Sequence, residues 1–383
     1  MAGIYIHFPF CKQKCVYCSF YSVASLQRRA EYWEGLFKEM ELRKDFLPKK
    51  NIDTLYIGGG TPSLCTPAEL ERLMEKLQQY YTFSPSAEIT LEANPEQLTA
   101  DYLSALKTVG INRLSIGVQS FDDTILRLLN RRHDAATALS AVQEAARVGF
   151  DNLSIDLIYD IAYRSGEMWR QELATALRLP IVHLSCYSLT VEENTLLARR
   201  VREGQPYLPE ETDTERDFQI LREMTAKAGF QQYEISNFAK EGRISRHNHA
   251  YWTGEPYLGL GPAAHSYCHP VRQWNVADLK RYVEGMSCGR PDREEEVLTP
   301  DQQYDEYVLL RLRTCEGIVL AEMEAKFGAA RKAQFLRQLQ RVRSDLYRRD
   351  GAAVRLTEAG LLFADAVAEE LFAEEGREEK MKR

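Results

Sequence analysis

Short β-rich runs alternate with helical patterns over the first half of the chain. Each run contains β-branched residues over five or six positions, and three of the runs also contain a tyrosine. The segments between the runs place apolar residues at helical spacing, as Trp33, Leu36 and Met40 do on one face of a helix. The predicted strands lie near residues 3–7, 54–58, 88–92, 113–118, 153–158 and 182–187.

Six successive strand–helix units predict a parallel sheet, because crossovers between parallel strands are right-handed and bring each strand beside the last. Thr66, Pro67 and Glu69 support one of the helices with a capping box at its start. A closed barrel of this kind needs eight units. We therefore predict an α/β fold built on a partial (βα)6 barrel, with a doubly wound open sheet as the alternative.

The pattern changes in the second half of the chain. Residues 200–217 are polar and acidic and predict a surface excursion, and residues 285–303 resemble a domain boundary. Beyond them, three helices, a hairpin turn at Asp350-Gly351 and a last helix capped by Thr357 predict a small winged-helix-like α+β domain. The predicted division is a partial barrel over 1–200, a barrel extension over 201–290, the winged-helix-like domain over 304–371 and a tail over 372–383.

Composition narrows the class of protein. The chain has 383 residues, 44% hydrophobic and 27% charged, which excludes wholesale disorder. Its net charge of −7 gives no broad attraction to nucleic acid, and we expect no nucleic-acid partner. No apolar run approaches membrane-spanning length and the N-terminus has no signal-peptide form, so we expect a cytoplasmic protein. The basic segment 328–349 favours a solvated face, with a partner protein or peripheral membrane contact as alternatives.

Three of the eight cysteines, Cys11, Cys15 and Cys18, fall within eight residues just after the first strand. Three thiolates can hold three irons of a [4Fe–4S] cluster and leave the fourth iron open. A tetrahedral zinc site with His7 as its fourth ligand is the first alternative. Three structural cysteines are the second.

A glycine run, Gly58-Gly59-Gly60-Thr61-Pro62, follows the second predicted strand. Glycines there let the backbone approach a ligand closely. Together with the C-x3-C-x2-C array and Tyr17 before its last cysteine, this run resembles the signature of the radical S-adenosylmethionine (SAM) superfamily. That resemblance implies a [4Fe–4S] cluster whose open iron is chelated by the methionine part of S-adenosylmethionine.

Polar residues also end one predicted strand after another, which favours a single site at the rim of the barrel. The segments YIHFPFCKQKCVYCSF, YIGGGTP, LEANPE, RLSIGVQSF and NLSIDLIY resemble the coproporphyrinogen dehydrogenase-like branch of the superfamily. The resemblance covers nearly the whole chain. The S-adenosylmethionine contacts that it implies are Tyr5, Tyr17, Gly59, Gly60, Thr61, Glu92, Gln119, Arg131 and Asp156.

This branch contains oxygen-independent coproporphyrinogen III dehydrogenases and HemW-type haem chaperones. Phe20 stands where the dehydrogenases carry a further cysteine, and only ten residues precede Cys11, whereas the dehydrogenases have an N-terminal extension. Residues 247–252 read HNHAYW and match the HNxxYW pattern of the chaperones.

The resemblance to the HemW-type chaperones implies that the protein binds haem and transfers it to an acceptor protein, a respiratory protein being one candidate. His247 is the implied haem ligand, and His249 and His265 are alternatives. The alternative function is radical decarboxylation of coproporphyrinogen III, an activity that we do not expect.

One segment departs from the family. Residues Asp160 to Tyr163 stand where the family has Gly-Leu-Pro-Gly. Because two glycines and a proline are missing, we expect the turn after the fifth strand to change and the nearby cofactor pocket to differ.

Overall fold

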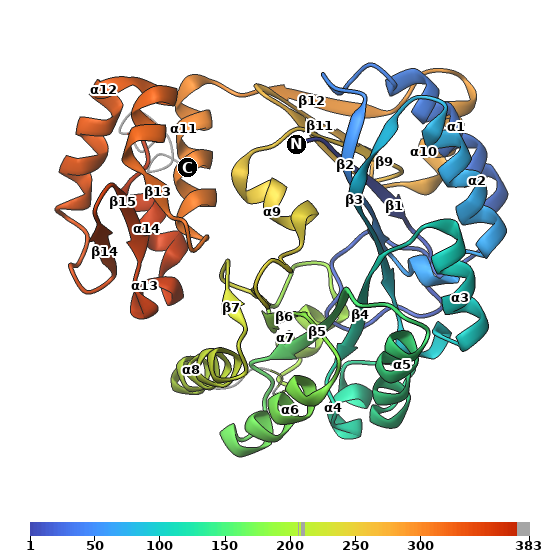
Figure 1. Cartoon of the computed structure of the whole chain (residues 1–383), viewed down its shortest axis with the longest axis horizontal. Coiled ribbons are helices and arrows are strands. Elements are labelled where there is room, and N and C mark those ends of the chain that lie inside the picture. Colours follow the sequence, from blue (N-terminus) through green and yellow to red (C-terminus); the bar gives the residue numbers. More distant parts are fainter. Residues whose placement is uncertain (206, 208–210, 374–383) are drawn as a thin grey trace.

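Six parallel strands form the centre of a twelve-stranded sheet (Figure 1). The computed structural model describes residues 1–205, 207 and 211–373, so most of the predicted tail lies outside the described residues. The six strands are β1 (Gly3–Phe8), β2 (Asn51–Gly59), β3 (Thr82–Ala93), β4 (Arg113–Gln119), β5 (Leu153–Tyr159) and β6 (His183–Ser188).

These strands pair in chain order, each parallel to the next. A doubly wound sheet would reverse its strand order at a switch point, which these six strands do not do. The prediction of an α/β partial barrel is therefore confirmed. The connecting helices are α1 (Arg29–Arg43), α2 (Pro67–Gln78), α3 (Ala100–Val109), α4 (Asp123–Leu128), α5 (Ala135–Arg147) and α6 (Gly166–Arg178).

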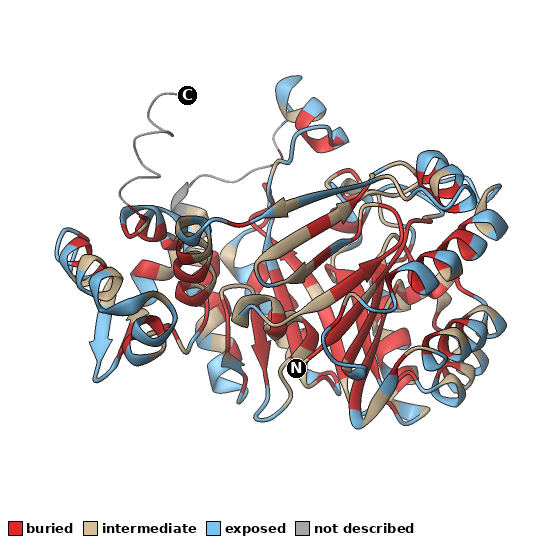
Figure 2. Ribbon diagram, turned by 90° about the horizontal axis from the view of Figure 1, so that it is seen from above, coloured by how far each residue is buried: buried red, intermediate tan, exposed pale blue. Residues whose placement is uncertain are grey.

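The helices cover the outer face of the sheet and expose their polar sides, while the strands are buried (Figure 2). The predicted capping box is present, with the Thr66 side chain accepting from Glu69 N and the Glu69 side chain accepting from Thr66 N. Because the six strands are parallel neighbours, their carboxyl ends all lie on one rim.

Further strands extend the sheet at both edges. Beyond β1 lie β9 (Tyr257–Leu260), β10 (His265–Cys268), β11 (Val271–Asn275) and β12 (Arg293–Val297). Beyond β6 lie β8 (Asn237–Ala239) and β7 (Gln231–Gln232). The helices of this region are α7 (Leu196–Arg202), α8 (Glu211–Lys227), α9 (Arg246–Thr253) and α10 (Leu279–Ser287).

Both polar stretches contain regular structure, and the stretch 285–303 also includes the point near residue 300 where one hydrophobic core gives way to the next. The polar stretch 200–217 is not only a surface excursion, because α8 begins within it, at residue 211. The stretch 285–303 contains β12, which pairs with β11, and the start of a helix capped by Thr299. Both stretches are rich in polar and charged residues, since a strand at a sheet edge and a solvated helix carry few apolar positions.

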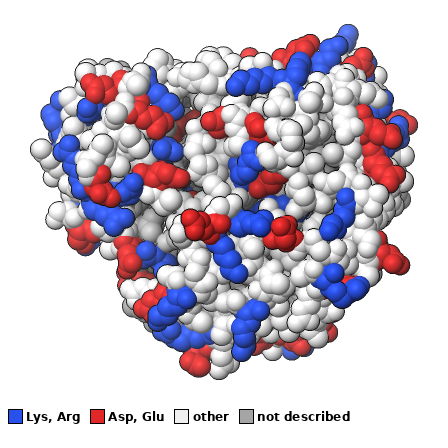
Figure 3. All heavy atoms as spheres, viewed as in Figure 1, with Lys and Arg blue, Asp and Glu red and all other residues white. Residues whose placement is uncertain are grey.

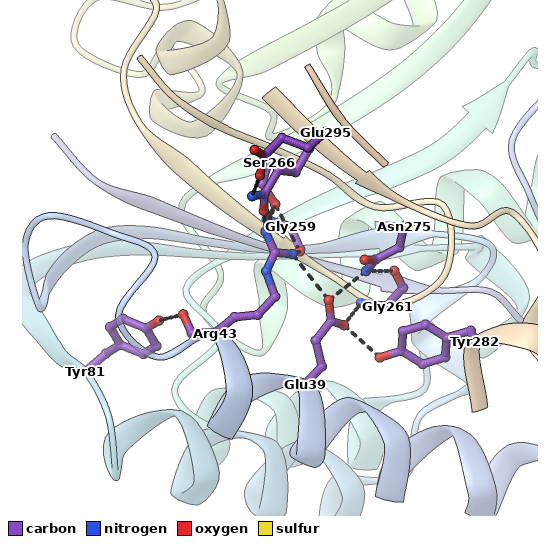
Figure 4. A network of polar contacts seen from close by, with 10 residues as sticks. Glu39, Arg43, Tyr81, Gly259, Gly261, Ser266, Asn275, Tyr282 and Glu295 are labelled. Carbon is purple, nitrogen blue, oxygen red and sulfur yellow. Dashed lines mark hydrogen bonds and ion pairs between the residues drawn. The ribbon is translucent and has the colours of Figure 1, made fainter. Parts of the chain in front are cut away.

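A buried polar network joins α1 to the added strands (Figure 4). The Arg43 guanidinium donates to Gly259 O, to the Ser266 hydroxyl and to Gln273 Oε1, at 2.8 to 2.9 Å. Glu39, one turn earlier, accepts from Asn275 Nδ2 and from Tyr282 Oη at 2.7 and 2.8 Å. Every charge in this interior position is hydrogen-bonded to a partner on another element, so the network sets where β9 to β11 lie against the barrel.

The C-terminal region has a hydrophobic core of its own, formed by residues from Tyr304 to Ala373. The hairpin turns at Asp350-Gly351 and Thr357 caps the next helix, as predicted. Its elements are α11 (Pro300–Leu312), β13 (Ile318–Val319), α12 (Leu320–Leu339), β14 (Tyr347–Asp350), β15 (Ala353–Leu356), α13 (Glu358–Leu362) and α14 (Ala364–Glu370).

Basic and acidic side chains are interspersed on the face drawn in Figure 3, and no single sign covers it. Many of these side chains form ion pairs, such as Arg147 with Glu144 and Arg199 with Glu203. Among the residues described, no helix combines the length and the apolar character needed to cross a membrane.

Candidate functional site

The cysteine loop lies at the carboxyl end of β1, on the barrel rim. Cys11, Cys15 and Cys18 carry free, partly accessible thiols. Burial raises the pKa of Cys11, and it raises that of Cys18 to about 11. In the described part of the chain, no three such side chains converge as ligands of one metal ion. An iron–sulfur cluster distributes its cysteines over several irons, so three separate thiols on one loop suit a cluster.

The zinc alternative needs His7 as a ligand, and its ring is engaged elsewhere. Nε2 lies 2.8 Å from Tyr21 O, and Nδ1 lies 3.1 Å from Tyr5 Oη. Burial lowers the pKa of His7 to about 4, so the ring is neutral. Its hydrogen bonds position Tyr5 and the segment that follows the cysteines, and a metal bond would replace one of them.

The glycine run brings the end of β2 against the cysteine loop. Gly60 N donates to Phe8 O at 2.8 Å, and a Cβ on Gly60 would lie 2.7 Å from Phe10 O. Gly59 has a φ of 104°, which favours glycine, and a Cβ there would meet the His7 ring. Thr61 Oγ1 then reaches Cys11 Sγ at 3.4 Å. Only glycine allows this close approach of two loops at the rim.

Glu92 is a buried carboxylate beside the glycine run. Its Oε1 accepts from Tyr56 Oη at 2.8 Å and its Oε2 from Gly59 N at 3.1 Å. Burial raises its pKa to about 7, and the negative charge of Asp156 adds to the rise. Near neutral pH the Glu92 carboxyl is therefore divided between its two protonation states, and a cationic or hydroxyl-bearing ligand would favour the carboxylate.

Arg131 joins the neighbouring strand ends to the cysteine loop. Its Nη1 lies 3.3 Å from Cys15 Sγ, and its Nη2 donates to Asn94 Oδ1 and Gly117 O at 2.7 Å. Its Nε is buried and finds no hydrogen-bond partner among the described residues. A half-buried cation with a spare buried donor, in contact with the Cys15 thiol, fits a site for an anionic group.

Gln119 and Asp156 complete the rim on β4 and β5. Gln119 has a φ of 68°. Its side chain lies close over Gly117, because a Cβ at position 117 would come within 2.9 Å of Gln119 Nε2. Asp156 Oδ1 accepts from the Ser115 hydroxyl at 3.2 Å, and burial raises its pKa. The structure thus brings the rim residues from five adjacent strands to one place, beside the cysteines.

Two residues of this site were not predicted from the sequence. Tyr56 lies between Tyr5 and Glu92, and Arg113 is a fully buried cation at the start of β4 whose charge acts on Glu92 and Asp156. An arginine at the start of a strand that is buried along its whole length is a visible signal, because a buried charge needs a counter-charge. Tyr56 carries no such signal, since tyrosine is common in strands.

The HNHAYW segment forms α9, which lies between the barrel and the C-terminal region (Figure 1). His247 points into the barrel and is 1% exposed. His249 Nε2 pairs with Glu316 at 3.2 Å, and the Arg313 guanidinium lies 5.5 Å above the Trp252 ring. The motif therefore connects the two regions as well as presenting Tyr251 and Trp252 to the space between them.

That space is a cavity of about 1120 Å³ at the mouth of the barrel. The barrel contributes Tyr5, His7 and Phe20, and Phe20 is 67% exposed. The C-terminal helices contribute Tyr307 and Phe327. The cavity is also lined by Tyr251, Trp252, Tyr257, His265, Tyr267, His269, Arg272, Trp274, Leu310, Arg311 and Lys326. Such a cavity accepts a large, mainly apolar molecule that carries a few charged groups.

Comparison with known proteins relates the chain to one family over nearly its whole length. Residues 5–171 match the radical SAM superfamily model, and residues 298–363 match the HemN C-terminal domain model. The chain is 34% identical to the Heme chaperone HemW of Bacillus subtilis, over 96% of this chain and 98% of that protein. It is 37% identical to the mouse mitochondrial radical S-adenosyl methionine domain-containing protein 1, over 84% of this chain and 70% of that protein.

The fold is shared with a solved structure, the coproporphyrinogen III oxidase HemN of Escherichia coli. The TM-score is 0.84, and the match covers 97% of this chain and 90% of that one at 23% sequence identity. At this identity the likeness concerns the fold. The near-complete coverage of HemW proteins, together with the cysteine loop and the glycine run, identifies this chain as a member of the HemW family within the radical SAM superfamily.

Proposed function

We propose that this protein is a haem chaperone that holds a [4Fe–4S] cluster and S-adenosylmethionine at the barrel rim and carries haem in the adjacent cavity. The observation that carries the proposal is the cavity, which is lined by aromatic side chains and opens beside the cysteine loop. Relatives named as haem chaperones over the full length support it.

Cys11, Cys15 and Cys18 would hold the cluster. The cluster and S-adenosylmethionine together supply one-electron chemistry at the open iron. Thr61 and Arg131 contact two of the three sulfurs, and their polar hydrogens would stabilise the thiolate form. Glu92, Gln119 and Asp156 provide acceptors for the hydroxyl and ammonium groups of S-adenosylmethionine, and Gly59 and Gly60 let it lie against the backbone.

The C-terminal region would close the haem cavity. Division of the chain near residue 300 is supported by two separate hydrophobic cores. Helices α11 and α12 supply one wall of the cavity, and the barrel supplies the other. Because the two walls come from different cores, a small change in their separation would admit or release a flat molecule, as delivery to an acceptor protein requires.

The test is a haem titration of the anaerobically reconstituted protein, followed by mixing with a haem-free acceptor. We expect a saturable change in the Soret band near one haem per chain, and movement of haem to an apo-cytochrome faster than to serum albumin. Coproporphyrinogen III should not be consumed when reductant and S-adenosylmethionine are added. Consumption of coproporphyrinogen III without haem binding would instead establish the dehydrogenase function.

A further inference from the structure

Four histidines lie in or near the cavity, and their environments differ. His7, His265 and His269 line it, whereas His247 does not. A haem ligand needs an imidazole nitrogen that is unprotonated and free to meet the iron. The hydrogen bonds of each ring therefore distinguish the candidates.

Both ring nitrogens of His247 are engaged. Nδ1 lies 2.8 Å from Thr54 Oγ1 and Nε2 lies 2.8 Å from Tyr251 Oη. The ring also stacks on Tyr56, with the ring centroids 5.2 Å apart. The backbone of Gly3 packs closely against the ring, since a Cβ on Gly3 would lie only 3.2 Å from His247 Nδ1. For His247 to bind iron, α9 would have to leave the barrel. The His7 ring is likewise buried and engaged at both nitrogens.

The His265 side chain is exposed within the cavity. Its ring stacks on Trp274 with centroids 5.9 Å apart and an interplanar angle of 22°. In the described part of the molecule, no side chain hydrogen-bonds the imidazole. Partial burial lowers the pKa of His265, and the charge of Arg272 lowers it further, so the ring is neutral at neutral pH.

The strands that carry His265 form a fixed wall. His265 pairs with Trp274 across β10 and β11, and Ser266 pairs with Gln273 in the next register position. Because successive side chains of a strand point to opposite faces, the first pair faces the cavity and the second faces the Arg43 guanidinium. The buried network of Figure 4 thus holds this wall from behind.

The opposite wall suits a flat apolar ring that carries two carboxylates. Tyr307, Leu310 and Phe327 provide apolar surface, and Arg311 and Lys326 provide positive charge beside them. Arg272 adds a third cation from the strand wall. Arg272 forms an ion pair with Glu306, and Arg311 and Lys326 both pair with Glu322. The propionate groups of haem would bind the same cations, either beside these glutamates or in their place.

We propose that His265 is the residue that ligates the iron of bound haem, with the ring of Trp274 beside the macrocycle and Arg272 directed to a propionate. The assignment rests on the proposed function, namely that the protein binds haem. His265 thus takes the role of haem ligand that the sequence motif implied for His247. The role of His247 is then to anchor α9 on the barrel.

The test compares single variants by haem titration and by absorption spectra of the ferric and ferrous–CO forms. We expect His265→Ala to weaken haem binding by about tenfold or more and to move the Soret band, because a direct metal bond is lost. The matched control is His269→Ala, which removes an exposed histidine of the same cavity and should keep the parent band. His265→Cys should give the absorption typical of thiolate-ligated haem, a change that a structural role would not produce.

The outcomes separate the two proposals. Far-UV circular dichroism and iron content equal to those of the parent establish that each variant is folded. If His265→Ala and His265→Cys keep the parent spectrum and affinity, His265 is not the ligand. Should His247→Gln then lose the band, haem binding stands and the ligand is His247. If the parent itself shows no saturable binding, the proposed function fails.

Discussion

Tyr163 has a φ of 68° although it is neither glycine nor asparagine. It is the last of the four residues that replace Gly-Leu-Pro-Gly, and Asp160, the first, has a φ of 60°. The two left-handed positions are therefore those where the family has glycine. The chain keeps left-handed positions in this turn at a steric cost, because a Cβ in this region costs about 1–2 kcal/mol.

Replacing Tyr163 by glycine should stabilise the protein. The side chain is 74% exposed, so its removal loses little packing, and glycine relieves the steric cost. The greater freedom of glycine in the unfolded chain offsets about 0.5–1 kcal/mol of that gain. We expect the free energy of unfolding to rise by up to about 1 kcal/mol, measured by urea denaturation. The control is Phe363→Gly, which should destabilise the protein because Phe363 has an ordinary φ of −113°. Equal effects of the two substitutions on the free energy of unfolding would show that the backbone at Tyr163 is not strained.

Single alanine replacements of Cys11, Cys15 and Cys18 should each remove iron and brown colour from anaerobically prepared protein. All three thiols lie on one loop, and we propose them as the cluster ligands. The parent should contain about four irons per chain, as the cluster requires. Cys65→Ala and Cys186→Ala, at two buried cysteines elsewhere, are the controls and should keep the iron. Full zinc occupancy without iron after anaerobic reconstitution would contradict the assignment.

Glu92 should make the stability of the cluster-free protein depend on pH near neutrality. Its pKa is raised to about 7 in the folded protein, while an unfolded glutamate titrates near 4.3. Its contribution to stability is therefore complete below about pH 4 and is lost as the pH rises through 7. We expect Glu92→Gln to flatten the fall in melting temperature between pH 5 and pH 8. Parallel curves for parent and variant would show that Glu92 ionises normally.

At the scale of elements, the decisive contact is the one between α1 and the strands that extend the sheet. Arg43 and Glu39 lie one turn apart on α1 and bond to β9, β10, β11 and α10. Arg43 is 216 residues from Gly259 in the chain. Periodicity alone showed that α1 has a buried face, yet it could not show that two charged residues on that face meet polar partners.

Arg43→Met should destabilise the protein by about 3–5 kcal/mol, because it leaves the buried Glu39 carboxylate without its counter-charge. The double variant Glu39→Gln with Arg43→Met should recover part of the loss, since no buried charge remains. Urea denaturation measures both. Haem affinity of the single variant should also fall, since Ser266 and Gln273 lose the group that holds their strands. A loss below about 1 kcal/mol would show that the network is not tightly coupled.

For the whole molecule, we expect the cluster and the haem to bind independently. His265 lines the cavity and the three cysteines do not, although Ser19, Phe20 and Tyr21, which follow Cys18 in the chain, also line it. The Cys11, Cys15 and Cys18 alanine variants should therefore still bind about one haem per chain, with affinity within about threefold of the parent. Loss of haem binding together with the cluster would indicate one shared site.

Local sequence signals were enough to predict the class of fold and the positions of the candidate cluster ligands. Strand and helix signals are local, so six βα units, the capping box at Thr66 and the hairpin at Asp350-Gly351 were all predictable. The cysteine spacing and the glycine run act within a few residues, and the rim position of Glu92 and Asp156 follows from parallel strands having their ends on one side. These features need no knowledge of distant contacts.

The tertiary structure alone decided what surrounds each histidine and where the cavity lies. Motif and spacing could not show that His247 is enclosed by Thr54 and Tyr251, or that His265 stands free beside Trp274. The cavity walls come from β1, the added strands and the C-terminal helices, and the most distant lining residues, Tyr5 and Phe327, are 322 positions apart in the chain. Hydrophobic periodicity specifies which face of an element is buried, but the partner of that face depends on the packing of all elements together.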